Sequence, residues 1–262
     1  MNFFEQIIYM LQGTMEEPKA FGWFHLLWIF IVIFSLLILY KLKNKYCEKQ
    51  LKTVLFIYGF GALVLEIIKQ VIWSFNYENG IVLWDYQWYA FPFQLCTTPI
   101  YVSLICLFLK DNKLRKSLLS YMAFITILGS ITTIIMPDSC FVETIEVNIH
   151  TMWLHCGSLV VSIYLVMTKE VELSFKNLVN AFVVFLMFVC LAECLNIVVF
   201  NSGILNGETF DMFYISPYFI SDLPVFNQIQ ENFPFVVFLI SYILVIFIGA
   251  FVIYFIEKKI IK

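Results

Sequence analysis

The stretch PFVVFLISYILVIFIGAFVIYFI, residues 234–256, contains no charged side chain. About 20 consecutive apolar residues are enough for one α-helix to cross the hydrocarbon core of a bilayer. Similar stretches recur along the chain, whose 262 residues are 61% hydrophobic and only 13% charged. A soluble domain of this length needs more charge to cover its surface. The sequence therefore predicts an all-α fold, a polytopic transmembrane helix bundle.

Seven membrane spans are expected, and together they form a single domain over residues 1–262. The spans are placed at residues 20–41, 53–75, 88–109, 117–136, 148–168, 177–200 and 234–256. The first span is not read as a cleavable signal peptide, because acidic residues precede it and no small-residue cleavage site follows it. No internal repeat and no low-complexity linker is apparent.

The charged residues of the linkers predict the orientation of the bundle. Basic residues gather in alternate linkers and at the C-terminus: Lys41, Lys43, Lys45, Lys49, Lys52, Lys110, Lys113, Arg115, Lys116, Lys169, Lys176, Lys258, Lys259 and Lys262. The other linkers contain only Lys19 and are otherwise acidic. Because basic loops stay in the cytoplasm, the N-terminus is expected outside and the C-terminus inside. The net charge of −3 gives no reason to expect nucleic acid as a partner.

Polar and ionisable side chains inside the spans gather in the half of the membrane that is expected to face outside. They are His25, Glu66, Lys69, His150, His155, Glu193 and Asn196. An ionisable group in a bilayer costs about 2.5–3.5 kcal/mol on insertion scales, so such groups face the bundle interior and often mark a site. We therefore expect one polar chamber beneath the outer leaflet.

Each of these residues also has a purely structural interpretation. Glu66 and Lys69 lie on one helix face and would neutralise each other. Glu193 and Asn196 would equally serve as hydrogen-bonding links between helices. His25 is typical of a helix-packing residue, and His150 is expected to be solvated at the membrane rim. All cysteines except Cys96 are expected to be small apolar fillers, without a disulfide framework.

The third expected span carries a polar seam. With a 4-3-4-3 spacing, the seam consists of Pro92, Cys96, Pro99, Ser103 and Cys106. If the whole span is helical, Pro99 frees the carbonyl of Leu95 beside the thiol. In that case Cys96 lies roughly 12 Å below Trp88.

The fifth expected span carries a second seam, which consists of Thr151, His155, Ser158 and Ser162. It offers an imidazole at a depth similar to that of the Cys96 thiol. A thiol with a pKa of about 8.5 is a weak nucleophile and needs a base or a cation nearby. The spacing alone does not say whether the two seams face each other.

Three short motifs resemble the YwaF and transmembrane protein 164 family. They are Gln-Leu-Cys at residues 94–96, HTMWLHCG with His155, and FHLLWI in the first span. The resemblance is least clear after residue 200. It implies a membrane-embedded acyltransferase or transacylase that acts on glycerophospholipids, with Cys96 as the nucleophile and His155 as its partner.

On this hypothesis, Cys96 takes an acyl chain from a phospholipid of the outer leaflet and His155 acts as the general base. Gln94, Thr97 or Lys69 would donate a hydrogen bond to the oxyanion, and Glu66 or Glu193 would orient an imidazole. The expected partners are phospholipids and lysophospholipids, with no obligate protein partner. No metal, nucleotide or other cofactor is expected. The expected location is a bacterial cytoplasmic membrane.

The connection at residues 201–233 is long for a compact domain and rich in aromatic residues. We expect it to lie at the outer interface, either as a lid over the chamber or as an ordinary interfacial loop. The rival functions are a transporter or a ligand-binding sensor with a polar chamber. A haem protein that uses His25 and His155 as axial ligands is a third alternative.

Overall fold

A computed structural model describes residues 2–43, 47–78, 81–137 and 140–260. Six helical segments in it are long and apolar enough to cross a membrane. They are α2 (Trp23–Leu42), α3 (Glu48–Ile72), Lys113–Ile135, α7 (Ile145–Met167), α8 (Phe175–Asn201) and α10 (Phe235–Ile260). The expectation of a helical membrane protein is therefore confirmed.

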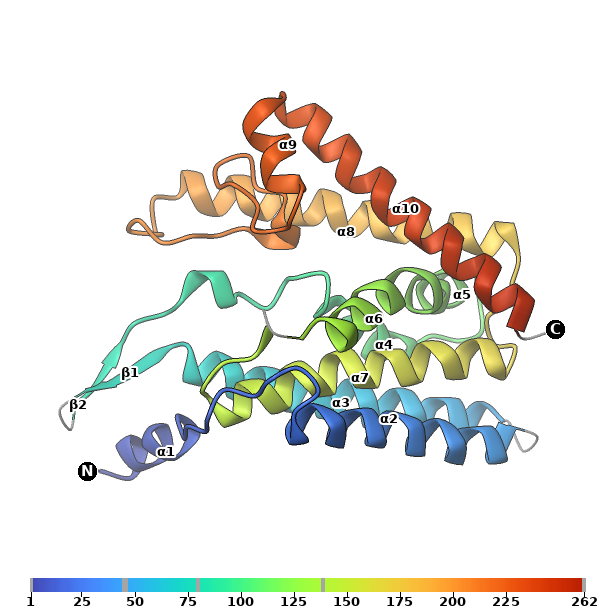
Figure 1. Cartoon of the computed structure of the whole chain (residues 1–262), viewed down its shortest axis with the longest axis horizontal. Helices are drawn as coiled ribbons and strands as arrows, with labels where there is room; N and C mark the ends of the chain where they lie inside the picture. Colours follow the sequence, from blue (N-terminus) through green and yellow to red (C-terminus); the bar gives the residue numbers. More distant parts are fainter. Residues whose placement is uncertain (1, 44–46, 79–80, 138–139, 261–262) are drawn as a thin grey trace.

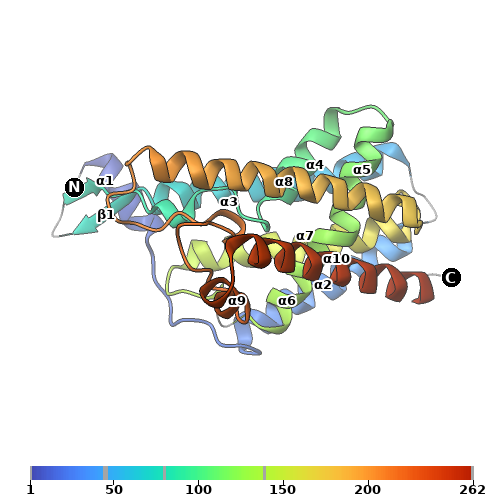
Figure 2. The ribbon, with the colours of Figure 1, turned by 90° about the horizontal axis from the view of Figure 1, so that it is seen from above.

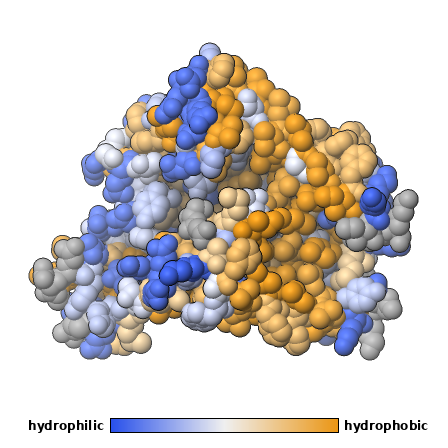
Figure 3. Space-filling model, viewed as in Figure 1, coloured by the Kyte–Doolittle hydropathy of each residue, from blue (hydrophilic) through white to orange (hydrophobic). Residues whose placement is uncertain are grey.

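The long helices run alongside one another, with α8 and α10 forming a layer over the others (Figures 1 and 2). Large apolar side chains remain exposed along them, such as Phe30 on α2, Phe56 on α3 and Val245 on α10. In Figure 3 these surfaces form an apolar band between two more hydrophilic ends. A band of this kind suits the hydrocarbon core of a bilayer, where water is absent.

The third expected span is only half a helix. Helix α4 (Thr98–Phe108) has 11 residues, about 16 Å in length, whereas the hydrocarbon core is about 30 Å thick. Before it, the chain forms the short 3-10 helix η2 (Trp88–Ala90) and then irregular turns up to Thr97. The expected helix at 88–109 is therefore wrong over residues 88–97.

The reason lies in the prolines. Pro99 stands in the first turn of α4, where a residue without an N–H costs nothing, so it starts this helix and does not kink it. The carbonyl of Leu95 is not free, because the hydroxyl of Thr98 donates to it at 2.7 Å. The expected 4-3-4-3 seam therefore fails for Pro92 and Cys96, which precede the helix.

The fourth span contains a π-helical turn between two α-helices. Helix α5 (Lys113–Tyr121) continues into η3 (Met122–Thr126) and then α6 (Ile127–Ile135). The carbonyl of Met122 accepts hydrogen bonds from the hydroxyls of Thr126 at 3.0 Å and Ser162 at 2.7 Å. The hydroxyls of Ser158 and Thr126 lie 3.1 Å apart. Part of the polar seam of α7 therefore holds this turn.

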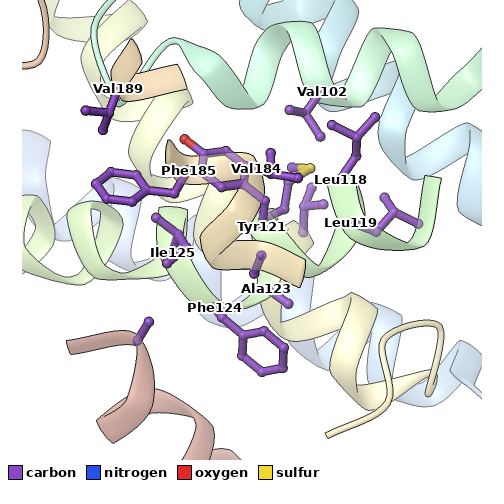
Figure 4. Close-up of a cluster of buried hydrophobic side chains, with 14 of the residues drawn as sticks. Val102, Leu118, Leu119, Tyr121, Ala123, Phe124, Ile125, Val184, Phe185 and Val189 are labelled. Atoms are coloured by element: carbon purple, nitrogen blue, oxygen red, sulfur yellow. The ribbon is translucent and has the colours of Figure 1, made fainter. Parts of the chain in front are cut away.

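The main core forms where this π-helical segment meets α4 and α8. Tyr121, Phe124 and Ile125 pack there close to Val102 and Phe185 (Figure 4). Fully buried residues are concentrated in this region. In α2 and α10, by contrast, only a small share of the residues is buried.

Helices α3 and α7 approach closely through two reciprocal glycine–aromatic contacts. A Cβ atom on Gly61 of α3 would lie 2.6 Å from the ring of Trp153 on α7. A Cβ atom on Gly157 of α7 would lie 2.6 Å from the ring of Tyr58 on α3. Small residues of this kind let membrane helices pack backbone to backbone.

The end of the bundle near the N-terminus carries further elements, and we call it the hairpin end. They are α1 (Phe3–Leu11) and an antiparallel hairpin of β1 (Phe75–Glu78) and β2 (Ile81–Trp84), with Phe75 paired to Trp84. The hairpin was not expected. The Asn-Gly pair at 79–80 is typical of a hairpin turn, although these two residues lie outside the described part of the chain.

The opposite end carries the basic linkers and the C-terminus, and we call it the lysine end (Figure 1). Arg115 is buried there, with 1% of its surface exposed. Its guanidinium binds both carboxylate oxygens of Glu48, at 2.9 and 3.0 Å, and lies 3.8 Å from Glu170. These contacts join the starts of α3 and α5 to the α7–α8 linker, so the basic linkers do share one end.

Candidate functional site

Cys96 lies in a tight turn formed by residues 94–97, directly before α4. The backbone N–H and the hydroxyl of Thr97 both donate to the carbonyl of Gln94, at 3.0 and 2.9 Å. The N–H of Gln94 in turn donates to the Thr97 hydroxyl at 3.0 Å. Cys96 as a residue is partly exposed. The turn leads directly into the N-terminus of α4, whose N-cap residue is Thr97.

The start of α4 lies level with the middle of α7. Ile100 of α4 and Leu154 of α7 share a small buried cluster with Ala62 of α3. Cys96 precedes Ile100 by about one turn, and His150 and His155 flank Leu154. The thiol therefore lies level with the part of α7 that carries both histidines.

A buried charged group lies at this level between α3 and α7. The ammonium of Lys69 is 2.8 Å from one carboxylate oxygen of Glu66, and Nε2 of His150 is 2.7 Å from the other. Glu66 and His150 are each only 4% exposed. The expected pairing of Glu66 with Lys69 is confirmed. The expectation of a solvated His150 is wrong, because this imidazole faces α3 and is bound by a carboxylate.

Gln70 and Tyr86 extend this group toward the hairpin end. The Gln70 amide donates to Glu66 at 2.8 Å and to the carbonyl of Ala90 at 2.7 Å. The Tyr86 hydroxyl donates to the Gln70 side-chain oxygen at 2.9 Å. Gln70 shares a helix face with Glu66, which the sequence shows. Tyr86 was missed, because its position depends on the hairpin.

A cavity of about 410 Å³ adjoins the group. Glu66, Gln70 and Ser74 line one side of it, and Trp84, Pro92 and Tyr101 line the other. Pro92 and Tyr101 flank the Cys96 turn in sequence, and the Tyr101 hydroxyl donates to the Pro92 carbonyl. Cys96 lies within electrostatic range of Lys69 and Glu66. The structure therefore brings the thiol, the charged group and a cavity into one region.

His155 faces a different neighbour. It is separated from His150 by about 140° around the helix axis. Its imidazole interacts with the backbone of Gly129 on α6 and lies within electrostatic range of His150. Within the described ranges, no hydrogen bond joins Cys96 and His155.

His25 and Glu193 lie beside other parts of the molecule. The His25 imidazole accepts a hydrogen bond from the N–H of Phe21 at 3.0 Å, and its ring packs edge-on against Phe141. This fits the helix-packing interpretation of His25. Glu193, on α8, lies within electrostatic range of Asp211 in the long connection.

Gln94 and Asn196 both bind the backbone of the long connection. Gln94 donates to the carbonyl of Asp211 and accepts from the N–H of Phe213, both at 2.8 Å. Asn196 accepts from the N–H of Met212 at 2.8 Å and donates to its carbonyl at 3.1 Å. Asn196 therefore serves as a hydrogen-bonding link, and the Gln94 amide is engaged on both sides.

The long connection lies over the Cys96 turn. Phe210 packs against Phe91, and Phe213 stacks against Phe93. The helix α9 (Phe226–Asn232) and the short 3-10 helix η5 (Met212–Tyr214) belong to this connection. Burial raises the pKa of Asp211 to about 7, although the N–H of Ser216 donates to its carboxylate at 2.7 Å.

The bundle and its polar group define a polytopic helical membrane protein with a polar site near one end. A family model described as the TMEM164 family matches residues 20–250, so the chain belongs to this family. The match includes residues 201–233, where the resemblance of the sequence motifs was least clear. Searches of curated proteins and of solved structures found no match.

Proposed function

We propose that this protein is a membrane-embedded acyltransferase or transacylase, which moves a fatty acyl chain between glycerophospholipids through a thioester on Cys96. The observation that carries the proposal is the position of the thiol. It lies directly before α4 and within electrostatic range of a buried charged group, and the cavity beside that group is lined by Pro92 and Tyr101, on either side of the Cys96 turn in sequence. Membership of the TMEM164 family adds support through the resemblance described above.

The proposed reaction has two steps, the transfer of the acyl chain to Cys96 and its transfer from Cys96 to a second lipid. In the first step, His155 takes the thiol proton and Cys96 attacks the carbonyl carbon of the ester. The ester oxygen then leaves as the hydroxyl of a lysolipid, and it takes its proton from His155. Then the hydroxyl of a second lysolipid gives its proton to His155 and attacks the thioester. The Cys96 thiolate leaves and regains the proton. Phospholipids and lysophospholipids are the substrates, and no cofactor takes part in either step.

Three side chains were expected as oxyanion donors, and two of them are engaged elsewhere. The Gln94 amide binds the long connection, and the Thr97 hydroxyl closes the Cys96 turn. Lys69 is the third, and it is within electrostatic range of Cys96. We assign the stabilisation of the oxyanion to Lys69, because a cation beside developing negative charge lowers the barrier.

Two histidines compete for the role of base. We assign it to His155, which the family resemblance indicates and whose ring is not bound to a carboxylate. His150 is the competitor, because Glu66 orients its imidazole as the acid of a catalytic triad orients its histidine. A base has to approach within hydrogen-bond distance of the thiol, so substitution of each histidine decides between them.

The proposal includes an orientation in the membrane. In this orientation, the six long helices and the segment at residues 88–108 would together make seven crossings. The lysine end would face the cytoplasm, since basic loops stay inside. The site would then open toward the outer leaflet of a bacterial cytoplasmic membrane.

The test is an acyl-enzyme assay in purified protein reconstituted in lipid. Incubation with a donor phospholipid should leave an acyl group on Cys96 that neutral hydroxylamine removes, as expected for a thioester. Cys96→Ala should lose the adduct and lipid turnover together. Cys190→Ala, on the exposed surface of α8, is the matched control and should keep both. Full turnover in Cys96→Ala would exclude the covalent mechanism.

A non-enzymatic transporter or ligand-binding sensor is the alternative. The sensor is favoured by the charged group, since both oxygens of Glu66 already have partners and need no chemistry. The transporter is disfavoured by Arg115, which joins three segments at the lysine end. A sensor would bind lipid without turnover, and its binding would persist in Cys96→Ala.

A further inference from the structure

The backbone of residues 211–213 is held by two side-chain amides from different parts of the chain. Gln94 reaches it from the Cys96 turn, and Asn196 reaches it from α8. Four backbone groups are bound in this way: the Asp211 carbonyl, the Met212 N–H and carbonyl, and the Phe213 N–H. The segment is therefore fixed by specific hydrogen bonds as well as by apolar packing.

The segment is also strained. Phe213 and Tyr214 have φ angles of +62° and +58°, in the left-handed region. Such a conformation is unfavourable for any residue that is not glycine. It persists only where surrounding contacts hold it, and here Phe213 is fully buried while its N–H is bound by Gln94.

Gln94 belongs to the turn that presents the thiol. Its backbone is bonded to Thr97, and Cys96 lies between these two residues. A second contact joins the same two parts of the chain, because the N–H of Trp88 donates to Glu208 at 3.0 Å. A displacement of residues 211–213 is therefore transmitted to Gln94 and from there to the Cys96 turn.

We propose that Gln94 is a positioning residue, through which the docked 211–213 segment sets the orientation of Cys96. The inference rests on the proposed function for its catalytic meaning, but the mechanical link does not require turnover. Gln94 acts through the turn and does not touch the reacting atoms. The long connection is then a lid whose docking prepares the nucleophile.

Gln230 on α9 provides a matched control. Its amide donates to the carbonyls of Ser216 and Phe219, both at 2.9 Å, and accepts from the N–H of Ser221 at 2.8 Å. It thus holds the same connection with a similar number of hydrogen bonds, but it does so beyond residue 213 and without contact to the Cys96 turn.

The experiment measures the rate at which iodoacetamide alkylates Cys96, in lipid nanodiscs and over a range of pH. The protein carries alanine at every other cysteine, and the variants are Gln94→Ala, Asn196→Ala and Gln230→Ala. We expect the first two to change the alkylation rate by about tenfold or more, since a displacement of about 1 Å can alter a reaction by up to about 10²-fold. Gln230→Ala should leave the alkylation rate close to that of the parent, because its hydrogen bonds go to residues 216–221 and not to the Cys96 turn.

Asn196→Ala is the decisive variant, because the side chain of Asn196 binds Met212 and Glu193 and is not bonded to the Cys96 turn. Hydrogen exchange at residues 211–213 reports the release of this segment directly. Faster exchange with an unchanged alkylation rate would overturn the proposal, as would an equal effect of Gln230→Ala. Since alkylation needs no lipid substrate, a protein that shows this pattern but forms no acyl adduct would reject the proposed enzyme and leave the positioning role intact.

Discussion

Glu66 is the residue on which three other side chains converge. Lys69, His150 and Gln70 all bind its carboxylate, which is almost entirely buried. A buried charge of this kind is tolerated only with its partners, and removal of the oppositely charged member of a buried ion pair typically costs about 3–5 kcal/mol. The carboxylate therefore organises the site whether or not it takes part in chemistry.

The Glu66–Lys69 pair can be tested by replacing both charges together. Glu66→Leu alone should be strongly destabilised in thermal unfolding, because it leaves the ammonium unpaired. Glu66→Leu combined with Lys69→Met should recover most of that stability, since an apolar pair of similar volume replaces a buried ion pair at little cost. The double variant should nevertheless lose lipid turnover if Lys69 stabilises the oxyanion as proposed above. Full activity would remove both residues from the site.

Substitution of the two histidines of α7 should have clearly different effects on the rate of lipid turnover. His155→Ala should fold and lose about 10²–10⁴-fold in turnover, the usual contribution of a general base. His150→Ala should lose much less turnover, but it should destabilise the fold by about 1–3 kcal/mol because a buried carboxylate loses a hydrogen-bond partner. Turnover rates and unfolding midpoints of the same preparations check both statements. The reverse pattern would assign the base to His150.

The contacts of single residues could be predicted from the sequence where both partners lie close together along the chain. The Glu66–Lys69 pair follows from helical spacing, and it forms. The burial of His150 was missed because its partner Glu66 lies on another helix, at a sequence separation of 84. The engagement of Gln94 by residue 213 was missed for the same reason. Contacts between distant segments leave no periodic signal along one chain.

Among the elements, the long helices were predictable and the half-helix α4 was not. An apolar run without breaks fixes a helix such as α10 almost regardless of its neighbours. At Pro92 and Pro99 the sequence permits either a kinked helix or a late helix start, and packing of the preceding turns under residues 210–213 selects the late start. The short hairpin was missed because it lies between two expected spans.

The long connection should respond to pH through Asp211, which lies outside the spans and is 8% exposed. Burial raises its pKa from 3.8 to about 7, the Ser216 N–H opposes this, and Asp222 and Glu193 add to it. The folded state therefore binds more protons than the unfolded state between about pH 4 and 7, and stability falls as the pH rises through that window. Well above pH 7 the Asp211 carboxyl is ionised in both the folded and the unfolded state, so its effect on stability no longer changes with pH.

Hydrogen exchange of residues 210–216 should accordingly be slower at pH 6 than at pH 8, after correction for the intrinsic rate. The difference in opening free energy should be at most about 1.4 kcal/mol per pH unit. Asp211→Asn keeps an acceptor for the Ser216 N–H and should abolish the dependence. An unchanged pH profile in Asp211→Asn would show that another group titrates.

At the scale of the whole molecule, basic and acidic linkers lie at opposite ends of the helix bundle. The basic linkers lie at one end of the bundle, and the connections that carry most of the acidic residues lie at the other (Figure 1). The alternation of linker charge predicted this grouping before any contact was known. It could not predict which helices pack together, because apolar surfaces that face lipid and those that face other helices have the same composition.

The orientation can be tested with single cysteines in a background without native thiols. A cysteine at Asn206 should react with an impermeant maleimide added from outside intact cells, and one at Asp111 should react only after the membrane is opened. The reason is that basic linkers are retained in the cytoplasm. Labelling of both positions from the same side would contradict seven crossings, and labelling of Asp111 alone would reverse the orientation.

The contact between Gln94 and Phe213 has a consequence for biosynthesis, since 119 residues separate the two in sequence. At about 5–20 residues per second, a ribosome needs roughly 6–24 s to synthesise that interval. During this time Gln94 and Cys96 have already been synthesised, but the segment that binds Gln94 does not yet exist. A nascent chain would therefore carry the Cys96 turn without its contact to Phe213 until the helices up to α8 have been synthesised.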